Sequence, residues 1–111
     1  MKQLDIWYAD LNPIKGSEQA GFRPVVIVSG NLLNEHLNTV IICPITTKLK
    51  HFRGDVILTP NKENKLSEKS EILTFHIRAI SKERLVRKIG VIKQKEHQLL
   101  LQYLNEILTL N

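Results

Sequence analysis

The chain has 111 residues, 42% of them hydrophobic and 24% charged, a composition that indicates one globular domain over residues 1–111 and excludes a disordered chain. Lys and Arg outnumber Asp and Glu by 16 to 11, so the formal net charge is +5 and favours an anionic partner, with nucleic acid as the first candidate. No apolar run reaches the roughly 18 residues of a membrane span. Asp5 and Asp10 interrupt the region that an export signal would occupy, so we expect a cytoplasmic protein without membrane contact.

The cysteine and histidine content predicts neither a disulfide nor a metal or other cofactor. Cys43 is the single cysteine, and its apolar neighbours predict a buried thiol. The four histidines, His36, His51, His76 and His97, lack the close spacing of zinc ligands.

Six short stretches have the alternating or β-branched pattern of strands. In chain order the predicted strands are residues 5–11, 23–29, 39–47, 55–59, 72–77 and 86–92. Four consecutive β-branched residues at 25–28 indicate a strand buried on both faces. Pro44 lacks a backbone N–H, so the third strand needs an edge or a bulge at that position.

Turn-forming and charged residues predict the connections between these strands. In chain order they are a loop at 12–21, a short helical turn at 31–37, a basic loop at 48–54, a mobile surface loop at 61–69 and a single turn capped by Ser81. Within the fifth strand, alternation predicts one face carrying Leu73, Phe75 and Ile77 and another carrying Ile72, Thr74 and His76.

The C-terminus has helical instead of strand periodicity. The apolar residues at this spacing are Leu100, Tyr103, Leu104, Ile107 and Leu108. Five to seven short strands followed by one helix predict a mainly β fold, a small and partly open β-barrel with a C-terminal helix.

Two segments carry residues suited to binding phosphate. In the first, a loop bounded by Gly16 and Gly21 leads into Arg23, whose guanidinium fork matches phosphate oxygens; an ordinary hairpin loop with a Glu18–Arg23 salt bridge is the alternative. In the second, Thr46 offers a hydroxyl and Lys48 a charge, although paired threonines also occur in strands simply because they favour them.

Two aromatic–basic steps, Phe22-Arg23 and Phe52-Arg53, suit stacking of unpaired bases, and Lys48, Lys50 and His51 add charge near the second step. The alternative for each step is a solvated loop with one buried phenylalanine.

The order and spacing of these residues resemble the MazF/PemK family of toxin endoribonucleases. The residues that carry the resemblance are Asp5-Ile6-Trp7, Asp10-Leu11-Asn12-Pro13, Gly16-Ser17-Glu18-Gln19-Ala20-Gly21, Arg23-Pro24-Val25-Val26, Ser29, Asn34 and Pro44-Ile45-Thr46-Thr47. A weaker similarity runs through residues 77–85. The match is specific over residues 5–47 and diffuse over 72–92.

The resemblance implies an SH3-like barrel of the MazF/PemK/CcdB-like toxin fold, a homodimer, and metal-independent cleavage of single-stranded RNA. In that family the 2′-hydroxyl attacks the adjacent phosphorus and leaves a 2′,3′-cyclic phosphate and a 5′-hydroxyl. Arg23 matches the catalytic arginine, Thr46 the catalytic threonine, and Glu18 an acidic position of the same cleft. The expected RNA-binding residues are Gln19, Phe22, Thr47, Lys48, Lys50, Phe52, Arg53 and His76.

Elementary chemistry restricts the roles of the three catalytic candidates. Arginine stays protonated, so Arg23 suits stabilisation of the phosphorane charge rather than general base catalysis. Thr46 suits donation to a non-bridging oxygen, and Glu18 suits orientation or deprotonation of the 2′-hydroxyl.

His76 stands where the family often has glutamine. It is either a surface or packing histidine, or a residue that reads a base or transfers a proton.

The resemblance also implies an inhibitory partner, an acidic and partly disordered antitoxin segment that competes with RNA for the basic cleft. Two other functions stay open at the level of sequence. One is a non-catalytic toxin of the same fold that acts on a DNA topoisomerase, and the other is a plain SH3-like RNA-binding module.

Overall fold

The computed structural model describes residues 1–12 and 21–109, which form seven strands, two α-helices and two single 3₁₀ turns. The strands are β1 (Asp5–Asp10), β2 (Phe22–Ile27), β3 (Thr39–Thr46), β4 (Val56–Leu58), β5 (Ser70–Ile72), β6 (Arg78–Ser81) and β7 (Leu85–Val91). The helices are α1 (Asn31–His36) and α2 (Gln94–Leu108), and the turns are η1 (Thr74–His76) and η2 (Lys82–Arg84).

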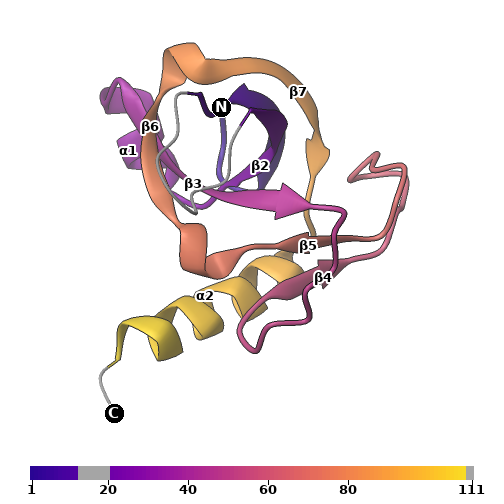
Figure 1. The fold of residues 1–111 in the computed structure, drawn as a ribbon. Helices are drawn as coiled ribbons and strands as arrows, with labels where there is room; N and C mark the ends of the chain where they lie inside the picture. The colour runs from indigo at the N-terminus through magenta and orange to yellow at the C-terminus, as the bar shows by residue number, and fades with distance from the viewer. Residues whose placement is uncertain (13–20, 110–111) are drawn as a thin grey trace.

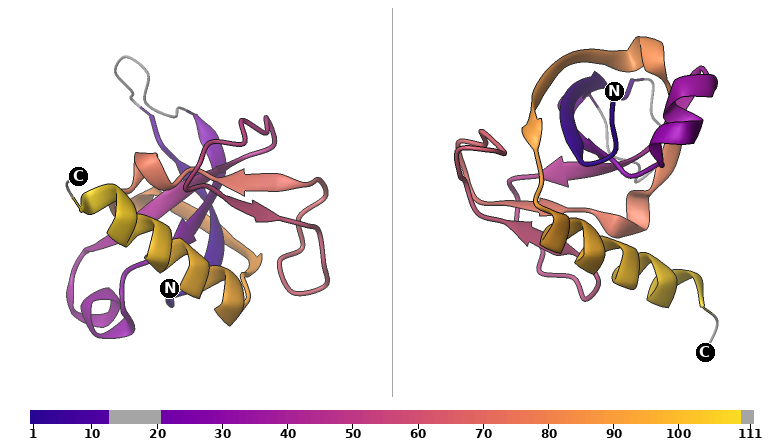
Figure 2. Two further views of the ribbon diagram at one scale, coloured as in Figure 1. Left: turned by 90° about the horizontal axis from the view of Figure 1, so that it is seen from below. Right: turned by 180° about the vertical axis from the view of Figure 1, so that it is seen from behind.

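Antiparallel pairing orders the strands β4-β5-β3-β2-β1-β7, and β6 pairs with the first half of β3. Figure 1 looks along the ring that β1, β2, β3, β6 and β7 form. Within the described residues β6 and β7 share no strand pairing, so the ring is partly open. The strands β4 and β5, together with the loop that joins them, form an arm that extends from the ring beside α2, as both views of Figure 2 show. The predicted fold class, a mainly β and partly open barrel with a C-terminal helix, is confirmed.

The apolar core consists of two clusters that share β2 between them. Val25 and Ile27 belong to a cluster built by residues of the ring strands and the segment just after β1. Val26 and Val28 belong to a second cluster that also contains residues of α2, β4 and β5. Because successive strand residues point to opposite faces, β2 contributes to both clusters, and its predicted burial on both faces is confirmed.

The C-terminal helix α2 packs against the arm and the second cluster through Leu100 and Leu104, which are buried as predicted. Burying each of these leucines contributes about 2 kcal/mol. Ile107 packs against Gly54 in the basic loop, whereas Leu108, at the helix end, is exposed. No helix within residues 1–12 and 21–109 combines the length and the apolar character that crossing a membrane requires.

The region after β5 departs from the predicted strand at 72–77. The chain leaves the sheet at Ile72 and turns through η1, because Leu73 N donates to Pro44 O (2.8 Å) and Thr74 N donates to Asp55 Oδ1 (3.1 Å). The predicted alternation of faces is therefore wrong: Thr74 is buried, and Phe75 is 55% exposed.

The loop at 61–69, predicted to be mobile and solvated, is held by a buried asparagine. The Asn64 side chain is 0% exposed; it accepts from the backbone N–H groups of Asn61 and Leu66 and donates to Thr59 O. Val91 N on β7 donates to Glu63 O at 3.0 Å, so the loop is joined to the ring.

Pro44 occupies the centre of the sheet, paired with Val25 of β2, and not an outer edge. On its other side the neighbour of β3 changes from β6, which ends its pairing at Ile42, to β5, which begins at Ile45. The missing N–H of Pro44 thus lies between these two pairings, where the ladder of strand hydrogen bonds is already interrupted.

The single thiol lies in the second core cluster, next to Pro44. Cys43 is fully buried, and burial, with a smaller contribution from Asp55, raises its pKa to about 12. The prediction of a buried thiol is confirmed.

Candidate functional site

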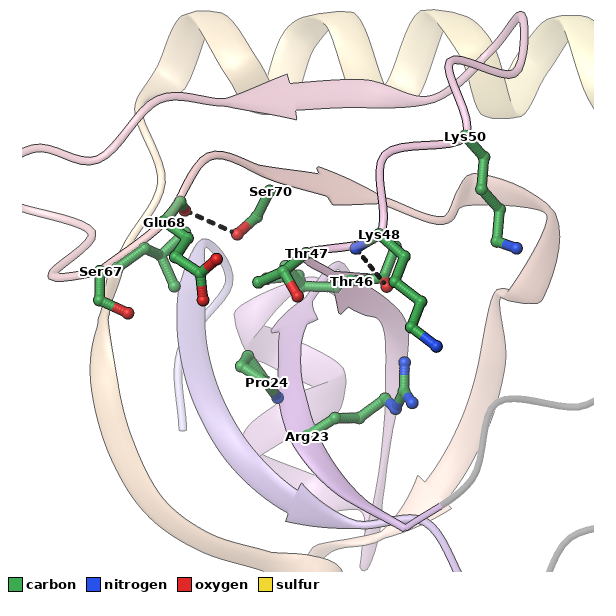
Figure 3. A pocket seen from close by; sticks show the side chains of 11 residues that line it. Arg23, Pro24, Thr46, Thr47, Lys48, Lys50, Ser67, Glu68 and Ser70 are labelled. Atoms are coloured by element: carbon green, nitrogen blue, oxygen red, sulfur yellow. Dashed lines mark hydrogen bonds between the residues drawn. The ribbon is translucent and has the colours of Figure 1, made fainter.

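A cavity of about 430 Å³ opens where β2, the end of β3 and the arm meet. Its lining residues are Arg23, Pro24, Ile45, Thr46, Thr47, Lys48, Lys50, Leu66, Ser67, Glu68 and Ser70. Figure 3 shows Arg23 on one side, Thr46 to Lys48 across from it, and the Ser67–Ser70 segment of the arm on a third side. Segments that are far apart in the sequence therefore build one concave surface.

Arg23 enters the cavity from the start of β2, where it pairs with Ala9 of β1. Pro24 follows it, which favours the extended backbone that Arg23 has as a strand residue. Partial burial lowers the pKa of the guanidinium from its usual value. Arginine nonetheless stays charged in proteins, so Arg23 supplies a fixed cation at the cavity wall.

Thr46 is the last residue of β3 and is 9% exposed. Its Oγ1 accepts from Lys48 N at 3.1 Å, which turns the chain from the strand into the basic loop. Since the oxygen serves here as the acceptor, the hydroxyl hydrogen is suited to donate toward a ligand.

Lys48 and Arg23 direct their cationic ends toward the same part of the cavity (Figure 3). Lys50 adds a third cation, and Glu68 supplies a carboxylate on the arm. Two side-chain cations that converge from β2 and from the loop after β3 favour an anionic group of phosphate size between them.

Glu71 of β5 anchors the basic loop (residues 48–54) through two hydrogen bonds. Glu71 Oε1 accepts from Lys50 N at 3.1 Å and from His51 N at 2.8 Å. Farther along the loop, Lys50 Nζ lies 6.0 Å from the ring centroid of Phe52. The Phe52 and Phe75 rings meet edge to face, with centroids 6.4 Å apart, and both are about half exposed.

Five of the residues selected from the sequence line the cavity: Arg23, Thr46, Thr47, Lys48 and Lys50. Phe52, Arg53 and His76 do not line it, although Phe52 and His76 lie on the adjoining loop and on η1. Glu18 and Gln19 lie outside the described residues.

Phe22 is placed away from the cavity, in contrast to its expected position beside Arg23. It stacks on Tyr8, with centroids 6.0 Å apart, and lines a separate groove with Asn12 and Arg84. The reason is the alternation of the strand, which turns neighbouring side chains to opposite faces.

Sequence reasoning assigned no individual residue of the arm to the site. The structure adds Leu66, Ser67, Glu68 and Ser70 to the cavity lining, and Phe75 to the exposed aromatic pair. The only sequence feature that could have indicated this segment is a polar Ser-Glu-Lys-Ser run after the apolar Leu66, and such a run is typical of any surface loop.

The charged side chains do not form a metal centre within the described part of the chain. There, no three His, Cys, Asp or Glu side chains gather closely enough to hold a metal ion. The chemistry available in the cavity is that of hydrogen-bond donors and fixed positive charge, which suits stabilisation of a developing oxyanion.

Comparison with solved structures identifies the fold. A Deinococcus radiodurans MazF structure is similar with a TM-score of 0.86, covering 97% of this chain and 96% of that chain at 20% identity. An endoribonuclease from a mycobacterial species, in complex with its cognate antitoxin, is similar with a TM-score of 0.82, covering 100% and 97% at 21% identity. The barrel, the arm and the terminal helix are thus the MazF fold.

Sequence comparison identifies the family. Residues 2–108 match the family described as PemK-like, MazF-like toxin of type II toxin-antitoxin system. The chain is also 36% identical over 97 residues to the endoribonuclease MazF of Staphylococcus saprophyticus, covering 86% of this chain and 81% of that protein. The chain therefore belongs to the PemK-like, MazF-like toxins of type II toxin–antitoxin systems.

Proposed function

We propose that this protein is the toxin of a type II toxin–antitoxin pair and a metal-independent, sequence-specific endoribonuclease that cleaves single-stranded RNA. The observation that carries the proposal is the meeting of Arg23, Thr46 and Lys48 at one cavity. Its support is the 36% identity to a protein named endoribonuclease MazF.

In the proposed reaction the 2′-hydroxyl oxygen of a ribose attacks the adjacent phosphorus. The new O2′–P bond forms as the P–O5′ bond breaks, which leaves a 2′,3′-cyclic phosphate and a 5′-hydroxyl. Glu18 takes the proton of the 2′-hydroxyl, and the leaving 5′ oxygen gains a proton from water while Arg23 stays protonated.

The phosphorane that forms on this path carries more negative charge on its oxygens than the ground state. Arg23 offers a fixed cation and two-pronged N–H donation to that charge, and Thr46 donates its hydroxyl hydrogen to a non-bridging oxygen. Both interactions strengthen as charge develops, so they stabilise the transition state more than the bound RNA.

The RNA chain would leave the cavity along the basic loop. Lys50 attracts the phosphates, and the half-exposed Phe52 and Phe75 present ring faces and edges on which unstacked bases pack. Glu68 and the two serines of the arm offer acceptors and donors to base edges, which gives the arm a role in choosing the cleaved sequence.

The proposed partners are an acidic antitoxin and a second copy of this chain. A mycobacterial relative is described in complex with its cognate antitoxin, and a cavity that attracts RNA attracts an acidic segment for the same reason. A groove completed across a homodimer would extend the short surface of one barrel. We place both partners and the reaction in the cytoplasm.

The decisive experiment compares Arg23→Ala with Arg87→Ala on a mixed-sequence RNA in the presence and absence of EDTA. Removing one charge-stabilising donor costs on the order of 10² to 10³ in rate, so we expect Arg23→Ala to lose cleavage while its circular dichroism spectrum is retained. Arg87, which lies 5.3 Å from the Tyr8 ring and does not line the cavity, is the matched control.

The products separate this proposal from its rivals. EDTA-resistant cleavage with cyclic-phosphate ends supports a ribonuclease, whereas wild-type rates in folded Arg23→Ala would refute the assignment of Arg23. RNA that is bound but never cut would identify a binding module, and inhibition of a DNA topoisomerase without cleavage would identify the non-catalytic toxin.

A further inference from the structure

Beneath the basic loop lies a carboxylate that the proposed reaction does not use. Glu71 is 0% exposed, although a charged side chain on its own is costly to bury. Its Oε1 accepts two backbone hydrogen bonds, from Lys50 and His51, whereas its Oε2 is buried with no partner among the described residues. Glu71 Oε1 therefore anchors the loop, whereas Glu71 Oε2 requires a hydrogen-bond donor.

A second carboxyl group, that of Asp55 just before β4, interacts with the first across the pairing of β4 with β5. Asp55 Oδ1 accepts from Thr74 N at 3.1 Å, and Asp55 Oδ2 is also buried with no partner among the described residues. If both groups were ionised, two negative charges would meet with no donor between their inner oxygens. One proton held between those oxygens satisfies both of them, as in other buried carboxyl pairs.

We propose that Asp55 and Glu71 share one proton and act together as a positioning pair, which fixes the basic loop at the cavity and releases it when the proton leaves. Neither residue lines the cavity, so both act through Lys50 and its neighbours. The inference rests on the proposed function only where it extends to RNA binding.

The pKa of Asp55 agrees with this geometry. Burial, followed by the hydrogen bond with Glu71, raises the pKa of Asp55 to about 7, while the Thr74 N–H acts in the opposite direction. The shared proton is therefore present below about pH 7 and absent above it. The nearby Cys43 thiol on β3 stays neutral throughout this range because its own pKa is raised to about 12.

Within residues 1–12 and 21–109, the other elements around the pair add no further carboxylate that gathers with it. The basic loop contributes the N–H groups of Lys50 and His51 to Glu71, with the side chains of Lys48 and Arg53 on the same loop. The turn η1 contributes the Thr74 N–H and carries His76. From α2, the apolar Ile107 packs against Gly54, the residue before Asp55.

Loss of the shared proton loosens the basic loop. With two carboxylates facing each other, Asp55 is held in place by the Thr74 N–H, and the fully buried Glu71 cannot turn toward solvent. Repulsion then acts on the one group that holds the N–H donors of Lys50 and His51. The loop loosens, and Lys48 and Lys50 lose their fixed positions at the cavity.

The first test needs no RNA. In full-length protein we expect the carboxyl carbon of Asp55 to titrate near pH 7 by ¹³C NMR. Amide protection at Lys50 and His51, corrected for the intrinsic pH dependence of exchange, should fall at least tenfold between pH 6 and pH 8.5. Titration of Asp55 near pH 4, the ordinary range, or constant protection at the two amides would overturn the proposal.

Two conservative variants replace the shared proton with a permanent donor. In Glu71→Gln, the amide oxygen can still accept from Lys50 and His51 while its NH₂ donates to Asp55; in Asp55→Asn, the roles are exchanged. Both variants should keep the two amides protected at pH 8.5. Glu63→Gln, an exposed glutamate on another loop, is the control and should follow the wild type. Loss of protection at high pH in both Glu71→Gln and Asp55→Asn would refute proton sharing.

The second test links the pair to RNA. With a 2′-O-methyl RNA that cannot be cut, the Kd of wild type should rise about tenfold from pH 6 to pH 8.5, and the Kd of Asp55→Asn should rise much less. A change in amide protection without a change in Kd would refute the role of the loop in binding RNA, and with it that part of the proposed function. A change in neither would refute the pair itself.

Discussion

At the scale of single residues, some of the most recognisable positions are structural. Ser29 and Asn34 are among the residues on which the sequence resemblance rests, and both are buried away from the cavity. Asn34 Nδ2 donates to Ser29 O at 2.8 Å, and Ser29 Oγ donates to Asn34 Oδ1 while it accepts from Ile41 N. The two side chains join α1 to β3 at the end of β2.

We therefore predict that Asn34→Ala lowers stability without lowering the cleavage rate of folded protein. Breaking these hydrogen bonds leaves buried polar groups unpaired, which costs about 1–3 kcal/mol. Urea denaturation measures the loss, and Asn38→Ala, at an exposed position, is the control. A normal unfolding midpoint, or a slow but fully folded variant, would contradict a structural role.

The cavity residues were predictable from the sequence where a single segment carries the information. Arg23 before Pro24 and Thr46 at a strand end each suit phosphate binding, but each leaves an ordinary alternative open, and the family resemblance over residues 5–47 selects them. Glu71 and Asp55 could not be paired in this way, because their meeting depends on the register in which β5 lies against β4, with Val56 opposite Ile72. No local pattern gives the register of strands that are joined by a loop.

At the scale of elements, the backbones of β7 and of the loop at 61–69 lie so close together at Gly90 that no side chain fits between them. A Cβ on Gly90 would lie 2.4 Å from Glu63 O and 2.6 Å from Asn64 O. The same approach forms the hydrogen bond from Val91 N to Glu63 O. The loop can therefore pack against the ring only because position 90 is a glycine.

We predict that Gly90→Ala destabilises the protein by about 2–3 kcal/mol, because the backbone of the loop must move away from β7. Gly30→Ala is the matched control, since no atom of the described residues other than its own chain neighbours lies within 4 Å of its Cβ position. Thermal unfolding of the two variants checks the prediction, which fails if they unfold at the same temperature.

Element prediction was accurate where burial and periodicity agreed and wrong where a hydrogen bond ended a strand early. The strand at β2 and the helix α2 follow from continuous apolar patterns, and the Ser81 cap is confirmed by Glu83 N donating to Ser81 Oγ at 3.3 Å. The strand expected at 72–77 ends at Ile72 instead. The cause is Asp55, 19 positions from Thr74, which no local alternation can reveal.

At the scale of the whole molecule, the net charge of +5 is only partly concentrated at the cavity. Arg23, Lys48 and Lys50 line it, Glu68 opposes them, and Arg53 does not contribute to the lining. Attraction of RNA by three cations should depend on salt, since each neutralised phosphate releases counterions.

We predict a slope of about −2 for the logarithm of the RNA binding constant against the logarithm of salt concentration, from three contacts at about 0.7 each on a single strand. Lys50→Gln should reduce the magnitude of that slope by about 0.7. Lys95→Gln, at the start of α2 and away from the cavity lining, is the control. Equal slopes for the two variants in a fluorescence titration would show that Lys50 does not contact the RNA backbone.

The buried thiol of Cys43 has a practical consequence for such measurements. Reagents that modify cysteine react with the thiolate, and in the folded chain this group is both covered and held neutral, with its pKa near 12. Cys43 lies on β3, three residues before Thr46. The rate at which an alkylating reagent labels this protein therefore reports how often that strand opens, without any engineered probe.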